Sequence, residues 1–454
     1  MKQKKQKKIP SVPKLQSILN TLRFVRTPIP VIMEAFEKHG DTYSFHIGGI
    51  HKAIISADPL FIQHFLQKNH RNYRKSETQT ETLAYYVGNG LLTSDGDYWL
   101  QQRRLIQPGF HREKLSALVA IIHEVIDDFT IHLDEVAKSG RPINIYESMH
   151  GLAFKIVAKA LFSTSIADEA MTELSKNITV VQEFIIKEIR QPYLAAWFKL
   201  SGAIKKHKTI SDASAAIILK VIRERKASKE NYNDLLDMLL QARYEDNGAA
   251  MSEKQLLDES LILFVAGHET SANALAWTLY LLSTHPEATD KLLAELPQLN
   301  HQSGFQELMT MPYSKQVIEE SMRIFPPAWI TDRISIADDE INGFFIPKGT
   351  MLVAFIYGVH HSEKLWQDPE TFRPERFDKS NRKNHTPYDY LPFGGGPRLC
   401  IGNNFAMMEM QLAIQRLIQR YTFELVPGQD IDPEPLITLR PKNGIFLRLT
   451  MRSS

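Results

Sequence analysis

The chain's only cysteine stands in the segment LPFGGGPRLCIG, residues 391–402, directly before a segment that reads as a helix. Three consecutive glycines free the backbone to fold tightly, and a helix that begins after Gly402 puts Cys400 at its N-terminus. Exposed amides and the helix dipole favour the thiolate there. A lone thiolate serves as a covalent nucleophile, a redox sensor or an axial metal ligand, and an inert buried thiol is the alternative. A single cysteine excludes an internal disulfide, a zinc site of several cysteines and covalent haem attachment through C-x-x-C-H.

A second candidate for chemistry lies in LILFVAGHETSANALAW, residues 261–277, which is apolar around most of a helical circumference and is expected to be buried. A carboxylate such as Glu269 costs several kcal/mol there unless it is paired or hydrated. From the residues alone, Glu269 could be an acid satisfied by a basic neighbour, with Thr270 bonded to its own helix. Ala266 and Thr270 share a face, and Gly267 would let a flat ligand approach the backbone.

A third candidate is the pair Glu320 and Arg323 in VIEESMRIFPP, at positions i and i+3 of a predicted helix. As a surface pair it would contribute only about 0.2–0.5 kcal/mol and would carry no function. Arg376 in FRPERF comes from an irregular stretch with few backbone partners. A second guanidinium that meets Glu320 would pin this stretch to the helix.

The elements that must position these residues are mostly helical. The clearest helix is expected to begin at Ser252, with a capping box to Gln255, and to end near Thr284 before Pro286. Helical periodicity dominates from about residue 96 to 299. A hairpin is predicted at residues 41–56 and a helix capped by Asp58, with further strands only near 341–356 and at the C-terminus.

The chain shows no internal repeat and no long linker, which favours one continuous domain over residues 1–454 with a basic, proline-containing tail at 1–13. A formal charge of +2 is too small to create the strong positive potential that would indicate nucleic-acid binding. No run of roughly 18 apolar residues predicts a spanning helix, so a soluble, cytoplasmic protein without a membrane anchor is expected.

Five motifs in order along the chain resemble those of the cytochrome P-450 superfamily. Phe393, Gly396, Arg398, Cys400 and Gly402 match F-x-x-G-x-R-x-C-x-G, the haem-thiolate loop. The others are WLQQR (99–103), AGHET (266–270), Glu320 with Arg323, and PERF (374–377). The resemblance spans nearly the whole chain.

The resemblance implies a mainly α-helical fold with small β-sheets that holds haem b between the long helix after Ser252 and the loop of Cys400. Cys400 would be the axial ligand of the haem iron, and Glu320, Arg323 and Arg376 would form a structural triad behind the haem. The remaining residues expected to bind the cofactor are Arg398, Arg103, Trp99, Arg333, Phe393, Ala266 and Gly267.

The activity implied is that of a monooxygenase, which inserts one oxygen atom of O2 into a C–H or C=C bond. Thr270 and Glu269 would deliver protons, and electrons would come from a separate ferredoxin or flavodoxin with its NAD(P)H reductase, because the chain has no G-x-G-x-x-G segment. The alternatives are a peroxygenase or isomerase on the same fold and a haem protein that only binds ligands.

The implied substrate is lipophilic, of the fatty-acid, terpene or carotenoid kind, because positions that match the family's substrate-facing regions are largely apolar. These positions are Tyr85, Tyr86, Leu92, Phe264, Ala266, Trp329, Ile330, Ile437 and Thr438. The segment 191–208 places Trp197, Phe198 and Leu200 beside lysines, which is consistent with ordinary helix packing or with contact to a membrane surface.

Overall fold

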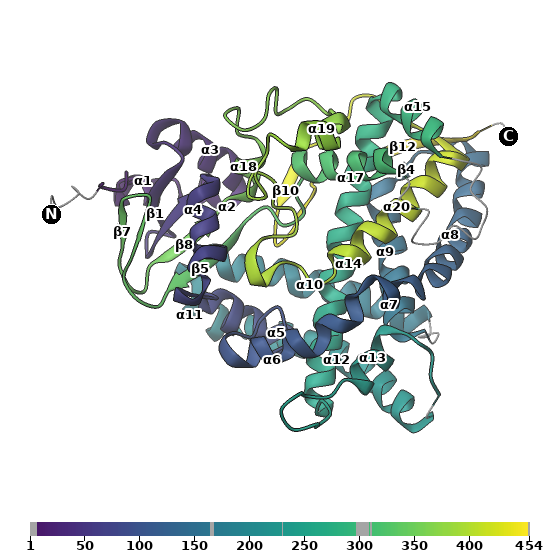
Figure 1. The fold of residues 1–454 in the computed structure, drawn as a ribbon, viewed down its shortest axis with the longest axis horizontal. Helices are drawn as coiled ribbons and strands as arrows, with labels where there is room; N and C mark the ends of the chain where they lie inside the picture. The colour runs from purple at the N-terminus through teal and green to yellow at the C-terminus, as the bar shows by residue number, and fades with distance from the viewer. Residues whose placement is uncertain (1–6, 164–167, 229, 297–307, 309–310, 453–454) are drawn as a thin grey trace.

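The computed structural model describes residues 7–163, 168–228, 230–296, 308 and 311–452, so residues 1–6 of the expected N-terminal tail lie outside it. The fold is mainly α-helical with small β-sheets, as predicted. Figure 1 shows the strands β1, β5, β7 and β8 gathered on the left and the long helices α8, α14 and α20 on the right.

The largest sheet has five strands in the order β1 (Thr42–Ile47), β2 (His51–Ser56), β8 (Met351–Ala354), β5 (Thr331–Ser335) and β3 (Tyr73–Arg74). The predicted hairpin is confirmed, since Thr42 pairs with Ser56 and Ile47 with His51. The smaller sheets consist of β4 (Ile143–Asn144), β9 (Tyr421–Leu425) and β12 (Phe446–Met451), of β6 (Asp339–Ile341) with β7 (Phe344–Ile346), and of β10 (Pro433–Pro435) with β11 (Leu439–Pro441).

Three strands lie where none was expected, namely β3, β4 and β5. Two of them have only two residues, which is too short for an alternating pattern to appear in the sequence. They are strands because distant partners pair with them, as β5 does with β8. The prediction that strands occur only near 341–356 and at the C-terminus was therefore wrong.

Helix α14 (Glu253–Thr284) crosses the molecule, since its 32 residues span about 50 Å. The capping box is confirmed, with the Ser252 N–H 2.8 Å from Gln255 Oε1 and the Gln255 N–H 3.2 Å from Ser252 Oγ. The helix ends where expected, and α15 (Pro286–Glu295) begins at the proline. The N-cap of Asp58 on α4 (Pro59–Gln63) is also confirmed.

The main core surrounds α14 and contains α8 (Val119–Ser139), α9 (Ile145–Phe162), α17 (Pro312–Ile324) and α20 (Asn403–Arg420). Aromatic side chains fix two of the contacts. Trp277 of α14 stacks on Phe325 at 3.8 Å between ring centroids, and Phe264 meets Phe154 of α9 edge-on at 4.8 Å. Contacts of this kind add about 0.5–1.5 kcal/mol each to the burial of the rings.

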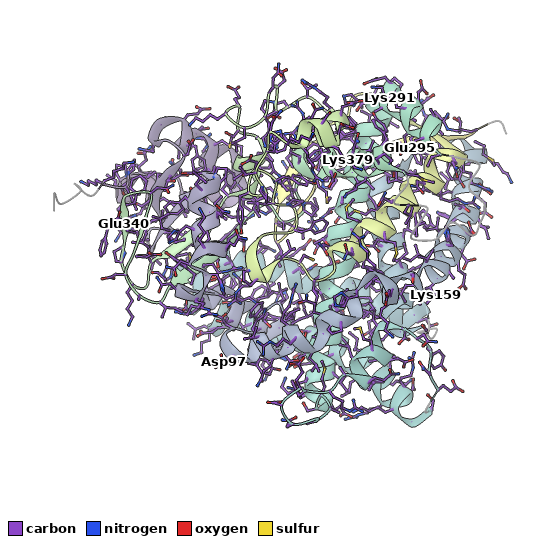
Figure 2. All side chains as sticks on the ribbon, in the orientation of Figure 1. Asp97, Lys159, Lys291, Glu295, Glu340 and Lys379 are labelled. Carbon is purple, nitrogen blue, oxygen red and sulfur yellow. The ribbon has the colours of Figure 1, made fainter. Side chains whose placement is uncertain are left out.

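The other α-helices are α1 (Lys14–Leu19), α2 (Thr21–Arg26), α3 (Pro28–His39), α5 (Ala84–Val87), α6 (Gly96–Ile106), α7 (Arg112–Ser116), α10 (Asp168–Arg190), α11 (Ala195–Leu200), α12 (Ala203–Ser228), α13 (Leu235–Gln241), α18 (Ile356–His360) and α19 (Lys379–Arg382). Charged side chains such as Glu340 and Lys291 lie at the edge of the molecule (Figure 2). Across the described part of the chain, no helix combines the length and the apolar character that crossing a bilayer requires.

Candidate active site

The loop that carries Cys400 is held by tight backbone contacts. Its short helical turn η7 (Gly396–Arg398) leads to Cys400, whose N–H donates to the carbonyl of Phe393 at 3.0 Å. Gly396 has φ +68°, and a Cβ there would lie 1.9 Å from the carbonyl oxygen of Leu66. Only glycine fits this close approach between two backbones, which explains part of the glycine run.

Cys400 is exposed, and it directly precedes the first turn of α20. Burial by the surrounding protein nevertheless raises the pKa of the Cys400 thiol, while the N–H of Gly402 and the Arg103 guanidinium oppose that rise. The N–H of Gly402 thus favours the thiolate, as expected at a helix N-terminus, but burial outweighs this effect. A metal cation bound to the sulfur would supply the missing stabilisation, because a coordinated thiol is deprotonated.

Arg103 of α6 lies against the cysteine loop. Its Nη1 donates to the carbonyl of Leu399 at 2.8 Å and its Nε donates to Gln107 at 3.1 Å. Burial lowers the pKa of Arg103, and the neighbouring Cys400 raises it. The guanidinium therefore brings positive charge next to the sulfur.

A buried basic cluster forms beside the loop. Arg398 stacks on the Trp99 ring at 4.4 Å and pairs with Asp95, yet its Nη1 is buried and has no hydrogen-bond partner. Arg333 is buried and donates to the carbonyl of Asp332 at 2.5 Å. Burial and the nearby Arg398 lower the pKa of Arg333 to about 10.

Lys75 completes this basic cluster and was not identified from the sequence. It is 4 % exposed and donates from Nζ to the carbonyls of Leu91 (2.9 Å) and Leu92 (2.7 Å). Burial and then the positive charges of Arg398 and Arg333 hold the pKa of Lys75 well below its usual range. In NYRKSETQ nothing marks this lysine as buried, so only the fold reveals it.

These residues fit haem b. Among the described residues, the one ion pair that these three cationic side chains make joins Arg398 to Asp95, and the Nη1 of Arg398 is a buried donor without a hydrogen-bond partner. Buried donors of this kind require a partner, and guanidinium groups suit carboxylates such as the haem propionates. An accessible sulfur close to them supplies an axial ligand for iron.

The middle of α14 borders an open face. Between residues 255 and 283, all of which the structure describes, Ala266 is the only exposed residue. Thr270 lies one turn further on the same face, and its hydroxyl donates to the Ala266 carbonyl at 2.8 Å. The threonine is thus bonded to its own helix, and its oxygen retains acceptor capacity.

Glu269 is buried and its carboxylate accepts hydrogen bonds from neutral donors, so the alternative of a basic hydrogen-bond partner is not met among the described residues. Gln182 of α10 donates to Oε2 at 2.5 Å, and Thr438 donates to Oε1 at 2.7 Å. Burial raises the pKa of Glu269, while Thr438, Gln182 and the nearby charge of Arg440 oppose that rise. No sequence motif marks Gln182, because its role depends on how α10 crosses α14.

Gly267 does not face the exposed side of α14. A Cβ at this position would lie 3.3 Å from Cγ2 of Val157 on α9, so its small size lets the two helices pack closely. The expectation that Gly267 admits a flat ligand is corrected accordingly.

Glu320, Arg323 and Arg376 come together as the sequence suggested. Arg323 donates to both oxygens of Glu320, from Nε at 2.7 Å and from Nη2 at 2.9 Å, and Arg376 Nε donates at 3.1 Å. The Arg373 N–H adds a further bond at 3.0 Å. This buried cluster joins α17 to the irregular segment before η6 (Pro374–Phe377).

The expected substrate-facing residues separate into two groups. Tyr86 and Ile437 share one apolar cluster with residues of α10 and α14. Tyr85 and Leu92, which are close to Tyr86 in the sequence, are exposed. Ile330 is partly buried and packs against a core cluster. Phe393, which is expected to bind the cofactor, is also partly buried and packs against the main core.

Three others are buried. Phe264 packs among Phe154, Phe162 and His268, because a helical offset of two residues from Ala266 turns it to the opposite face. The buried Trp329 donates from its indole to the carbonyl of Leu436 at 3.0 Å, and Thr438 bonds Glu269.

Comparison with known proteins identifies the family. The model of the family "Cytochrome P450" matches residues 10–448. The chain is 32% identical over 412 residues to cyclooctat-9-en-7-ol 5-monooxygenase of Streptomyces melanosporofaciens, with 90% of this chain and 88% of that protein covered. It is 30% identical to the chloroplastic protein LUTEIN DEFICIENT 5 of Arabidopsis thaliana (98% and 77% covered) and 32% identical to the putative cytochrome P450 132 of Mycobacterium bovis (86% and 86% covered).

Proposed function

Because this chain belongs to the cytochrome P450 family, and is an oxidoreductase of the monooxygenase kind, we propose that it inserts one oxygen atom of O2 into a C–H bond of a lipophilic small molecule. The observation that carries the proposal is the accessible Cys400 beside the buried basic cluster with its unpartnered Arg398 Nη1. We further propose that residues 1–454 act as one catalytic domain, which the family match over residues 10–448 supports.

The haem, when bound, supplies the activation of O2. Cys400 would hold its iron through Sγ, and Arg398, Arg333 and Lys75 would hold its carboxylates. The Arg398 guanidinium lies over the Trp99 ring, and its Nη1 is free to donate. The carboxylate of Asp95 pairs with Arg398 and so orients its guanidinium group.

The second role proposed for the protein's own residues is the delivery of protons. Burial raises the pKa of Glu269, which favours the protonated form of this carboxyl group in an otherwise apolar helix. Gln182 and Thr438 hold its carboxyl group in one orientation. Thr270 stands at the adjacent position on the exposed face of α14, where its hydroxyl would pass that proton on through water.

A lipophilic substrate is supported by the apolar cluster of Tyr86 and Ile437 and by a relative whose name gives cyclooctat-9-en-7-ol as its substrate. A separate ferredoxin-type or flavodoxin-type partner is proposed as the electron donor, and a cytoplasmic location fits the single cysteine.

The test is the carbon monoxide difference spectrum of the purified holoprotein reduced with dithionite. A Soret band shifted far to the red in the wild type, and absent in Cys400→His, would support thiolate ligation. A wild-type band at the position of histidine-ligated haem, or no haem at all, would refute the proposal. Product formation that requires an electron donor, rather than added peroxide, separates a monooxygenase from a peroxygenase.

A further inference from the structure

The segment of residues 88–95, which we name the 88–95 loop, connects α5 to α6 (Figure 1) and contacts both α14 and the basic cluster. Its Leu91 N–H donates to Oε2 of Glu259 on α14 at 2.9 Å. The carbonyls of Leu91 and Leu92 accept the two hydrogen bonds from Lys75. A single short segment of backbone therefore joins Glu259 to Lys75.

The loop lies very close to Glu259, because residue 90 is a glycine. A Cβ on Gly90 would lie 2.8 Å from Oε2 of Glu259, which is too short for two atoms that are not bonded. The Asn89 N–H donates to the preceding acid of α14, Asp258, at 3.1 Å. The charge of Asp258 is paired with the exposed Lys254, whereas none of the described residues forms an ion pair with Glu259.

The carboxyl group of Glu259 is fully buried, and its Oε1 has no hydrogen-bond partner in the part of the chain that the structure describes. A buried carboxylate with one hydrogen bond depends on a nearby positive charge. Burial raises the pKa of Glu259 to about 7; the Leu91 N–H opposes that rise, Asp258 adds to it, and Lys75 opposes it. The remaining group under the influence of this charge is the phenol of Tyr98 on α6. Lys75 therefore supplies the positive charge.

The same attraction acts on Lys75. Burial and then the charges of Arg398 and Arg333 lower its pKa, and the carboxylates of Asp95 and Glu259 oppose that fall. A charged ammonium group has three N–H donors, and the loop carbonyls use two of them. A neutral amine has only two. The third donor, which can reach a further acceptor, therefore exists only while Lys75 keeps its charge.

We propose that Glu259 is a positioning residue of the haem site, whose carboxylate keeps the Lys75 ammonium charged and, through the 88–95 loop, directs the third donor of Lys75 to a haem carboxylate. Glu259 acts on the haem only through Lys75. The inference rests on the proposed function, since it requires that the chain binds haem at the basic cluster.

The experiment measures how fast the holoprotein loses haem to an excess of apomyoglobin, followed by the change in haem absorbance. The variant Glu259→Gln keeps the shape of the side chain and an acceptor for the Leu91 N–H, so it removes mainly the charge. At about pH 6, below the pKa of Glu259, the carboxyl group is largely protonated in the wild type as well, and the two proteins should lose haem at similar rates.

At about pH 8 only the wild type carries the negative charge. Glu259→Gln should then lose haem about tenfold faster, because each unit by which the pKa of Lys75 falls changes the ratio of charged to neutral lysine tenfold. Lys75→Met removes the ammonium group itself and should lose haem faster than the wild type at both pH values. Adding Glu259→Gln to Lys75→Met should change the rate little, because the two residues act along one path.

The matched control is Glu253→Gln, which neutralises an acid of the same helix that pairs with Arg223 at the surface. It should lose haem like the wild type at both pH values. Glu259→Asp keeps the charge and should stay close to the wild type at about pH 8, and it decides the question if Glu259→Gln does not fold.

Three results would overturn the inference. Equal rates for the wild type and Glu259→Gln at the higher pH would show that the charge of Glu259 does not support Lys75. A variant that loses haem faster by the same factor at both pH values would assign Glu259 to holding the loop by its hydrogen bond alone. Additive effects of Glu259→Gln and Lys75→Met would exclude a path through Lys75.

The carbon monoxide spectrum of the wild type tests the proposed function separately. A thiolate spectrum together with any of these three results would overturn the role of Glu259 alone. A wild type without haem would refute the proposed function itself.

Discussion

Replacing Glu320 by alanine should destabilise the protein strongly and prevent haem retention. The Glu320 carboxylate is fully buried and accepts four hydrogen bonds, two from Arg323, one from Arg376 and one from the Arg373 N–H. Without it, two guanidinium groups stay buried with only carbonyl partners, such as those of His360 and Asp368. Removing one partner of a buried charge pair costs about 3–5 kcal/mol.

That loss is a large part of the total, because the free energy of unfolding of a native protein is about 5–15 kcal/mol. It acts where α17 meets the segment that leads through η6 towards the Cys400 loop, so we expect the loop to lose its position. Denaturant unfolding and the haem absorbance per protein chain measure the two effects. Glu320→Gln keeps the shape and one acceptor oxygen and should have a smaller effect.

The matched control is Glu34→Ala, which removes an exposed partner of Arg23. Surface pairs of this kind contribute little, so its unfolding curve and haem content should match the wild type. If Glu320→Ala also retained haem and unfolded at the same denaturant concentration as Glu34→Ala, the reasoning from buried charge would be refuted.

Thr270→Ala should retain haem and its carbon monoxide spectrum but divert electrons from product to hydrogen peroxide, because it removes the hydroxyl from the exposed face of α14. If the fraction of electrons that reaches product stayed unchanged, the role of Thr270 would be contradicted. Glu409 of α20, bonded by Ser271, gives a pH-dependent prediction, because burial raises the pKa of its carboxyl to about 8 from about 4.3 in an unfolded chain. The folded state holds this proton where the unfolded state has lost it, so the free energy of unfolding should fall by up to about 1.4 kcal/mol per pH unit between about pH 4 and 8 and become flat above. Glu409→Gln removes this dependence, and parallel stability curves for the two proteins between pH 5 and 8 would exclude it.

Much of the local structure follows from the sequence. The capping box of α14, the proline that opens α15 and the hairpin of β1 and β2 each depend on residues close together in the chain. The position of Cys400 before α20 is equally local. Such features depend on caps, turns and periodicity, which act over a few residues.

The direction of side chains on α14 was only partly predictable. Periodicity places Ala266 and Thr270 on one face and Phe264 on the opposite one, yet the sequence does not say which face is open. The packing of α9 decides this, since Phe154 and Val157 cover the side of Phe264 and Gly267. Likewise, only the crossing of α10 and the β10–β11 turn brings Gln182 and Thr438 to Glu269.

The amino-acid sequence by itself determined the helical class, the family and the chemical groups, because motifs, caps and the single cysteine are read along the chain. Only the tertiary structure decided the protonation and partners of these groups. Burial counteracts the effect of the helix N-terminus on Cys400, and Lys75 becomes part of the basic cluster although its sequence neighbours do not mark it. Burial and long-range contacts set the free energy of a charge, and both depend on residues that are distant in the sequence.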